Sequence, residues 1–193
     1  IYAYDFDQSG TMDVVLSTSY KGNLVPARGR ECSSEQMPFI KDKFEDYRSY
    51  ASATLKDIYG EDLDRARHKK AEMLASVFLR NNGNGNFDIV QLPLESQFSP
   101  VRGFGFIDLD KDGVEEIVTV GNLYNVEVET QRYDASKGNI MKYSAGAFSS
   151  IPYELTGFKT SGDARNLTIV TNGNKSHIIV VNNNGPLDVF KVN

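Results

Sequence analysis

Residues 5–15 read DFDQSGTMDVV, and residues 108–118 repeat the same pattern as DLDKDGVEEIV. In each copy the first and third positions are aspartate, the sixth is glycine and the ninth is a carboxylate. Aromatic or apolar residues precede each copy and β-branched residues end it, which predicts a loop between two strands. The copies start 103 residues apart (108 − 5), roughly twice the ~40–50 residues of one propeller blade. This repeat favours a propeller over a sandwich or a barrel of short strands.

The residues of both loops predict a calcium site. Calcium takes about six to eight oxygen ligands on a flexible loop, and a glycine at position 6 permits the sharp turn around the ion. In the first loop the expected ligands are Asp5, Asp7, Ser9, the backbone carbonyl of Thr11 and Asp13. In the second loop they are Asp108, Asp110, Asp112, the backbone carbonyl of Val114 and Glu116. Because a hydroxyl is a weaker calcium ligand than a carboxylate, we expect the loop with Ser9 to bind less tightly.

An EF-hand begins with a similar pattern but requires a glutamate at position 12 of its loop. That position holds Leu16 in the first copy and Thr119 in the second, inside expected strands, so an EF-hand is excluded. The remaining alternative is an acidic turn without metal, in which glycine closes a turn between solvated aspartates. Two copies in the same strand–loop–strand setting favour the calcium site.

The segment over residues 33–75 has the periodicity of helices, because apolar residues recur at intervals of three and four positions. Ser33 followed by Gln36 resembles a capping box, and Gly60 is expected to end a helix. We therefore expect two or three helices, packed on one side of the first blade and interrupting the connection between its second and third strands.

From residue 76 to the end the pattern is that of short strands separated by Gly and Asn turns. Two apolar runs, residues 76–80 and 87–92, flank a segment with Asn-Gly pairs, which is a strong hairpin signal. Further strands are expected at residues 103–108, 115–121, 139–143, 147–153, 166–171, 177–182 and 187–192.

Composition and charge argue against several functions. The net charge of −5 argues against nucleic acid as a partner, since no Lys/Arg stripe neutralises a phosphate backbone. No apolar run approaches the ~20 residues that span a bilayer. Cys32 is the only cysteine, so neither an intrachain disulfide nor a cysteine metal site is expected. The two histidines, His68 and His177, are far apart in the sequence.

The loop pattern Asp-x-Asp-x-Asp/Ser-Gly-x-x-Asp/Glu, followed by a strand, resembles the FG-GAP/VCBS repeats of integrin-type β-propellers. Phe104-Gly105 before the second loop and the hairpin over residues 79–87 are typical of the same family. Four further segments are similar to large bacterial VCBS-repeat proteins of surface or secreted type: 92–101 (LPLESQFSPV), 131–136 (QRYDAS), 162–165 (GDAR) and 184–190 (NGPLDVF). The resemblance implies a calcium-binding propeller that is secreted, periplasmic or at the cell surface, with no settled biochemical activity.

The expected fold is mostly β: a partial FG-GAP-type β-propeller of about three blades, with a small helical insertion in the first blade. The blades comprise residues 1–20 plus 76–93 with the insertion at 30–75, then 102–153, then 162–193. About three blades do not close a ring, which takes about four to eight. The chain opens at Ile1 without Met, so we expect the C-terminal portion of a longer protein whose signal lies upstream. We expect the remaining propeller blades or self-association to cover its apolar ends.

Five residues in turns outside the loops are candidates for a binding edge: Arg132, Tyr133, Asp134, Asp163 and Arg165. The alternative, which we favour, is that these charges pair with each other or with the backbone and hold blade corners. No catalytic residue is assigned, because no carboxylate pair has the spacing of a glycosidase. We expect a scaffold that binds a protein or a glycan and is stiffened by calcium. The alternative is part of a glycan-active propeller enzyme whose catalytic residues lie partly in missing upstream blades.

Overall fold

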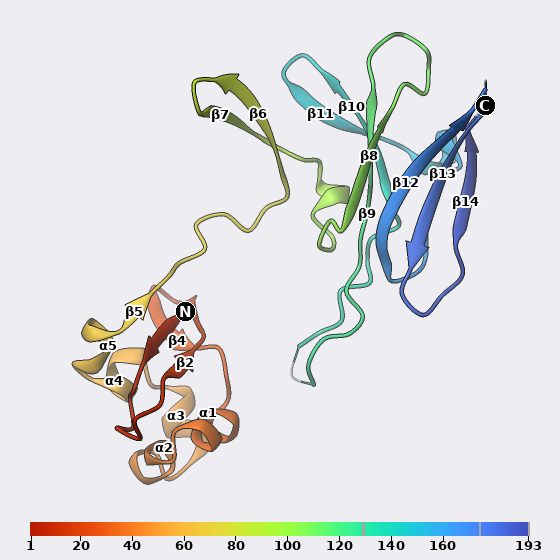
Figure 1. The fold of residues 1–193 in the computed structure, drawn as a ribbon. Coiled ribbons are helices and arrows are strands. Elements are labelled where there is room, and N and C mark those ends of the chain that lie inside the picture. Colours follow the sequence, from red (N-terminus) through yellow and green to blue (C-terminus); the bar gives the residue numbers. More distant parts are fainter. Residues whose placement is uncertain (129, 174, 193) are drawn as a thin grey trace. The chain divides into compact units, whose positions relative to one another are not determined.

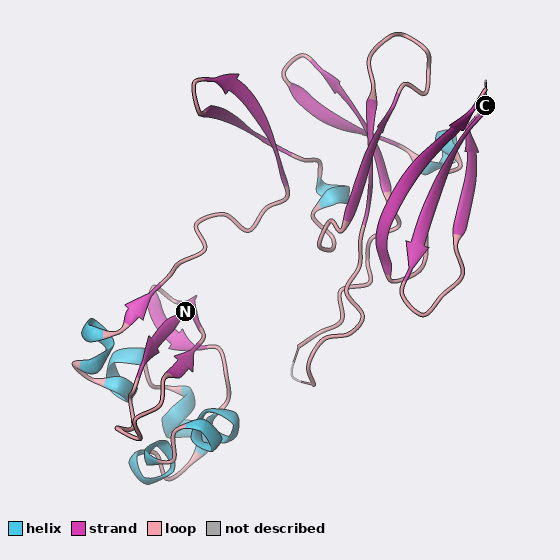
Figure 2. Cartoon of the chain, in the orientation of Figure 1, coloured by secondary structure: helices cyan, strands magenta, loops and turns pink. Residues whose placement is uncertain are grey.

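The structure, a computed structural model, describes residues 1–128, 130–173 and 175–192. Residues 129, 174 and 193, which fall in the second and third expected blades, lie outside the described residues. The fold is mostly β, as expected, and its described strands form several small antiparallel sheets, none of them closed. The chain divides into two compact units, Ile1–Met73 and Leu74–Asn193, each with its own hydrophobic core. Helices are concentrated in the first unit and strands in the second (Figure 1) (Figure 2).

The first unit contains a three-stranded antiparallel sheet in the order β2-β1-β5. Its strands are β1 (Tyr2–Tyr4), β2 (Asp13–Val15) and β5 (Arg67–His68). β1 and β2 are the two strands expected around the first acidic loop. The strand β5 differs from the helical expectation for its residues. It pairs with β1, and the ring of His68 stacks on that of Tyr2 with centroids 5.6 Å apart.

After β2 the chain forms a hairpin from β3 (Ser17–Tyr20) and β4 (Asn23–Pro26). Lys21 and Gly22 connect the strands with φ angles of 50° and 82°. Left-handed backbone at both central residues is the turn geometry that suits a two-residue hairpin. The strand β4 was not among the expected elements, because Lys-Gly is not one of the dipeptides that typically signal such a turn.

Five short helices replace the two or three longer ones expected over residues 33–75. They are α1 (Arg30–Gln36), α2 (Phe39–Lys43), α3 (Tyr47–Ala51), α4 (Leu55–Tyr59) and α5 (Asp62–Arg65). The capping box expected at Ser33 and Gln36 is wrong, because both residues lie inside α1, whose N-cap is Gly29.

Local stop and start signals divide the helical segment. Pro38 precedes α2 and has no N–H with which to continue α1. Asp46 caps α3, and its carboxylate accepts a hydrogen bond from a backbone N–H of the helix. Thr54 and Asp57 form a reciprocal capping box at the start of α4. Gly60 ends α4 with a φ of 59°, as expected.

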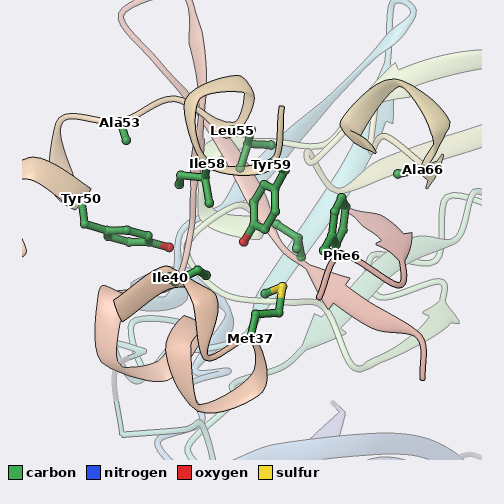
Figure 3. Close-up of a cluster of buried hydrophobic side chains, with 10 residues drawn as sticks. Phe6, Met37, Ile40, Tyr50, Ala53, Leu55, Ile58, Tyr59 and Ala66 are labelled. Carbon is green, nitrogen blue, oxygen red and sulfur yellow. The ribbon is translucent and has the colours of Figure 1, made fainter. Parts of the chain in front are cut away.

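The helices pack against the strands of the first unit through one core (Figure 3). Phe6, from the acidic loop, lies against Tyr59 of α4, with ring centroids 4.5 Å apart. The side chains of Ile40 and Leu55 are fully buried. The helices therefore pack against the strands of the first unit, and their expected position on the first blade remains a prediction.

Every strand expected from residue 76 onward is present in the second unit. The strands are β6 (Val77–Gly83), β7 (Asn86–Gln91), β8 (Gly103–Ile107), β9 (Glu116–Val120), β10 (Asn139–Ser144), β11 (Ala147–Ile151), β12 (Ala164–Asn172), β13 (Lys175–Asn182) and β14 (Asp188–Val192). Two short helices, η1 (Leu94–Ser96) and α6 (Tyr153–Thr156), lie between them. The strand expected to reach residue 153 ends at Ile151, because Pro152 lacks the N–H that a ladder needs and begins α6.

The strands of the second unit form a hairpin and two sheets. β6 pairs with β7, β8 to β11 form a four-stranded antiparallel sheet in chain order, and β12 to β14 form a three-stranded one. The hairpin contacts β11, where the rings of Phe78 and Phe148 lie 5.2 Å apart. The first blade expected from residues 1–20 and 76–93 remains a prediction.

The two larger sheets of the second unit pack face to face. Their shared core includes Val118 and Val120 from one sheet and Val180 from the other, all nearly inaccessible. Glycines on β8 permit this approach. A Cβ at Gly103 would lie 2.8 Å from the backbone of Asn166 on β12, closer than real Cβ contacts come.

Candidate metal centres

Each acidic loop connects two neighbouring antiparallel strands: the first links β1 to β2, and the second links β8 to β9. Both loops have left-handed backbone at their fourth and sixth positions. The φ angles are 58° at Gln8 and 86° at Gly10, and 61° at Lys111 and 88° at Gly113. Glycine adopts such angles without the steric cost of a Cβ. The same turn is thus built twice from different sequences.

Backbone N–H groups in the first loop converge on its aspartates. Asp5 accepts hydrogen bonds from the N–H groups of Ser9 and Gly10, both at 2.9 Å. The same N–H of Ser9 also donates to Asp7, at 3.0 Å. These bonds fix the turn, and a carboxylate has about four acceptor sites, so each aspartate can bind a further ligand.

The second loop repeats this pattern position by position. Asp108 accepts from the N–H groups of Asp112 at 3.1 Å and Gly113 at 3.0 Å. Asp110 accepts from the same N–H of Asp112 at 3.3 Å. The agreement of three hydrogen bonds and two left-handed positions makes the two loops one structural motif.

The carboxylate at position 9 closes each loop from the start of the following strand. Asp13 accepts a hydrogen bond from the N–H of Phe6 at 2.9 Å, and Glu116 accepts one from the N–H of Leu109 at 2.8 Å. These donors occupy the second position of their loops. Both carboxylates are buried, with 3% of Asp13 and 1% of Glu116 exposed. A buried carboxylate requires compensation by donors or a cation.

In each loop three carboxylates bring one oxygen each within 4.8 Å of the others. The sets are Asp5, Asp7 and Asp13, and Asp108, Asp110 and Glu116. Two oxygens that bind one calcium ion at ~2.3–2.6 Å lie at most about 5 Å apart, so both sets fit such an ion. The acidic side chains at positions 1, 3 and 9 are brought together, as the sequence predicts.

The side chains at position 5, Ser9 and Asp112, make other contacts. The Ser9 hydroxyl lies 2.8 Å from that of Thr11, within hydrogen-bond distance. Asp112 accepts a hydrogen bond from the N–H of Val114 at 2.8 Å and binds a lysine through its other oxygen. Asp112 does not belong to the converging carboxylate set of its loop.

A lysine that the sequence analysis did not select contacts the second loop. Lys142 lies on β10, where Met141 pairs with Ile117 of β9, so the next position lies beside Glu116. Its Nζ donates to Asp110 at 2.6 Å and to Asp112 at 2.5 Å. From the sequence, β9 and β10 are expected in one blade. Because the connection between them is long, sequence patterns do not predict which residues of the two strands pair.

The loops differ in how the carboxylate at position 9 is compensated. The Gln36 side chain, from α1, donates to Oδ1 of Asp13 at 3.3 Å. In the second loop Oε1 of Glu116 accepts no hydrogen bond within the described chain, and Nζ of Lys142 lies 3.6 Å away. The first loop therefore has an amide where the second has a cation.

The pKa values reflect these surroundings. Burial, followed by the nearby charge of Asp7, raises the pKa of the Asp13 carboxyl above its ordinary value. Hydrogen bonding from Ser9 lowers the pKa of Asp7. Hydrogen bonds from Lys142 lower the pKa of Asp112, and the same contacts raise the pKa of Lys142. Burial makes the charged form of Asp13 unfavourable, and a cation bound at the first loop would offset this cost.

The five candidates outside the loops form local pairs. Arg132 places its guanidinium 3.5 Å from the ring centroid of Tyr124 and pairs with Asp134 at 3.6 Å. Tyr133 forms an isolated backbone bridge with Leu123.

Asp163 and Arg165 form a second, more buried pair. Arg165 donates to Oδ2 of Asp163 at 2.7 Å, and Asn183 donates to the same oxygen at 3.1 Å. Only 2% of the Asp163 side chain is exposed. The hydrogen bond from Asn183 ties the end of β13 to the start of β12.

A polar pocket of about 540 Å³ adjoins Asp163. It is lined by Tyr124, Asn125, Ser161, Gly162, Asp163, Asn182, Asn183, Asn184, Gly185, Pro186 and Asp188. The hydroxyl of Tyr124 donates to the carbonyl of Ser161 at 3.1 Å. Asp163 lines the pocket, and Arg132 contacts the ring of the pocket residue Tyr124. The pocket therefore adjoins both the Arg132–Asp134 pair and the Asp163–Arg165 pair.

Comparison with protein-family models, curated proteins and solved structures finds no match to this chain. Within the described residues, no helix has the length and apolar character needed to cross a bilayer.

Proposed function

We propose that this chain is a calcium-stabilised repeat scaffold of the FG-GAP/VCBS propeller type, which binds a glycan outside the cytoplasm. The observation that carries the proposal is the structural identity of the two acidic loops. They share two left-handed positions and the hydrogen bonds made by carboxylates at positions 1, 3 and 9.

The sheets of the second unit support the propeller type. A propeller blade is a four-stranded antiparallel sheet, and β8 to β11 form such a sheet in chain order. The sheet of β12 to β14 packs on it through glycines and aliphatic side chains, as an adjacent blade would. In this arrangement each ion would join the first two strands of a blade.

The calcium part of the proposal is tested by calorimetric titration of the chain with calcium and with magnesium. We expect uptake of calcium at both loops and weaker uptake of magnesium, which requires a more rigid octahedral site. Asp110→Asn should remove uptake at the second loop. Glu115→Gln removes one negative charge from position 8 of the same loop, which is not an expected ligand position. This variant should leave calcium uptake intact. Absence of calcium uptake by the unaltered chain would contradict the proposal.

The polar pocket is the proposed glycan site. Amide and carboxylate side chains recognise sugar hydroxyls because they accept and donate hydrogen bonds in fixed directions, and the pocket volume of about 540 Å³ suits a small saccharide. Two buried oxygens at its wall, Oδ1 of Asp163 and Oδ1 of Asn182, accept no hydrogen bond within the described chain. Both belong to residues that line the pocket.

A glycan array with the purified chain tests the ligand class. Asn125→Ala, at an exposed pocket residue, should weaken capture of any bound glycan. Asn86→Ala, on the exposed hairpin strand β7, removes the same side chain away from the pocket and should have no effect. If neither variant changes glycan binding, the glycan binds outside this pocket. If the chain binds a protein and no glycan, the proposed ligand class is wrong.

A further inference from the structure

The second acidic loop already contains a positive charge. Nζ of Lys142 donates to Oδ2 of Asp110 at 2.6 Å and to Oδ2 of Asp112 at 2.5 Å. It lies 3.6 Å from Oε1 of Glu116, a buried oxygen that accepts no hydrogen bond within the described chain. Three of the expected calcium ligands of this loop therefore face one ammonium group.

In the described part of the chain, the carboxylates of the first loop have no recorded ion pair of this kind. Among the described residues, no lysine or arginine forms an ion pair with Asp5, Asp7 or Asp13. The donor that reaches Asp13 from outside the loop is the neutral amide of Gln36. The carboxylates of the first loop are compensated by N–H dipoles, whereas those of the second face a full charge.

We propose that Lys142 is a built-in counter-ion, which occupies the second loop without metal and competes with calcium for its carboxylates. This inference rests on the proposed calcium function. An ammonium group and a calcium ion repel each other and use the same oxygens, so calcium uptake requires the lysine side chain to leave. Lys142 is 30% exposed, and its long, flexible side chain can move into solvent.

Two consequences distinguish the loops. The second loop keeps its conformation without metal, because Lys142 holds Asp110 and Asp112 together. It also binds calcium more weakly than the first loop, because the lysine must be displaced. This order is the reverse of the one that Ser9 at position 5 predicts from ligand strength alone.

The test is calorimetric titration of the full chain with calcium, for the unaltered protein and four variants. Lys142→Met keeps most of the length of the side chain and removes its charge, and Lys142→Arg keeps the charge. Lys191→Met removes a charge from an exposed position of β14 and serves as the matched control. Asp7→Asn disables the first loop, so that the remaining uptake is assigned to the second.

We expect Lys142→Met to strengthen calcium binding at the second loop by about tenfold, since several contacts to charged acceptors are lost together. Lys142→Arg and Lys191→Met should leave the affinity of the second loop within about twofold. In EDTA, Lys142→Met should lower the melting temperature of the second unit, and Lys191→Met should not. The melting measurement also shows whether each variant is folded.

Unchanged or weaker calcium binding in folded Lys142→Met would overturn the counter-ion assignment while leaving the calcium function intact. If neither loop of the unaltered chain nor of Lys142→Met takes up calcium, the proposed function itself fails. Uptake at the second loop that appears only in Lys142→Met supports the assignment most directly, since the lysine then blocks the site.

Discussion

Nζ of Lys142 lies 3.6 Å from Oε1 of Glu116, across the neighbouring strands β10 and β9. In the first unit the corresponding carboxylate, Asp13, is reached by the amide of Gln36, from a helix. The repeated loop is therefore completed by different elements in the two units, a strand in one and a helix in the other. The two loops should consequently depend on metal to different degrees.

The melting temperature of the first unit is expected to depend on calcium through Asp7. In excess calcium Asp7→Asn should lower it, because a ligand at 100 times its Kd stabilises the native state by about 2.7 kcal/mol. In EDTA the same variant should change it much less. Calorimetric scans in both buffers provide the measurement, with Asp42→Asn on α2 as a control for the lost charge. An equal loss in both buffers would mean that Asp7 acts through hydrogen bonds alone.

Leu55→Ala is expected to destabilise the first unit by about 2–5 kcal/mol, because it leaves a cavity in a core where the leucine is fully buried. Leu74→Ala makes the same change at a side chain that is 91% exposed, and should cost less than about 0.5 kcal/mol. Hydrogen exchange read by mass spectrometry would locate the loss. Faster exchange should appear in residues 1–73 and not in β8 to β14, and a uniform increase would contradict two separate cores.

Gly103→Ala is expected to push β8 away from β12, because the new methyl group would lie 2.8 Å from backbone atoms that cannot rotate away. Overpacking of this kind costs about 1–3 kcal/mol. Gly29→Ala serves as the control for the added methyl group, since its Cβ meets nothing within 4 Å and its φ of −65° suits alanine. Because alanine is a poorer N-cap than glycine, this variant should cost about 0.5–1 kcal/mol. Urea unfolding of both variants measures the difference, and equal stabilities would show that the two sheets can separate freely.

Acid should weaken the capping box of α4. Hydrogen bonds from the Thr54 hydroxyl and backbone N–H lower the pKa of Asp57 from its ordinary value of 3.8. A carboxyl with a lower pKa in the folded state stabilises the fold above its unfolded pKa, and this contribution disappears as pH falls through the folded pKa. Asp57→Asn should therefore lower the free energy of unfolding near neutral pH. The further decrease in that free energy below about pH 4 should be smaller in the variant than in the unaltered chain.

The measurement is the urea midpoint between about pH 2.5 and 7. Asp42→Asn provides the comparison, because Asp42 is an exposed aspartate in the first turn of α2 that does not cap its helix. If both variants follow the same pH profile, the cap contributes nothing that depends on ionisation.

The helical segment shows where local patterns stop being sufficient. Its periodicity predicts helices correctly but not their number, because Pro38, Asp46 and Thr54 each end or start a helix within a few residues. The expectation of a helix around Arg67 is wrong for a different reason. That segment lies beside β1, and pairing with its free edge satisfies more backbone groups than a frayed helix end would.

The sequence alone determined the strands of the second unit, the two acidic loops and the three carboxylates that converge in each. These features depend on neighbouring residues: side chains alternate along a strand, glycine accepts left-handed angles, and a nine-residue loop brings its own ends together. Tertiary structure decided which groups complete each loop. Lys142 meets Glu116, and Gln36 meets Asp13, only after distant segments pair and pack. Strand register and helix packing are set by the whole core rather than by local pattern, so no spacing in the sequence specifies these contacts.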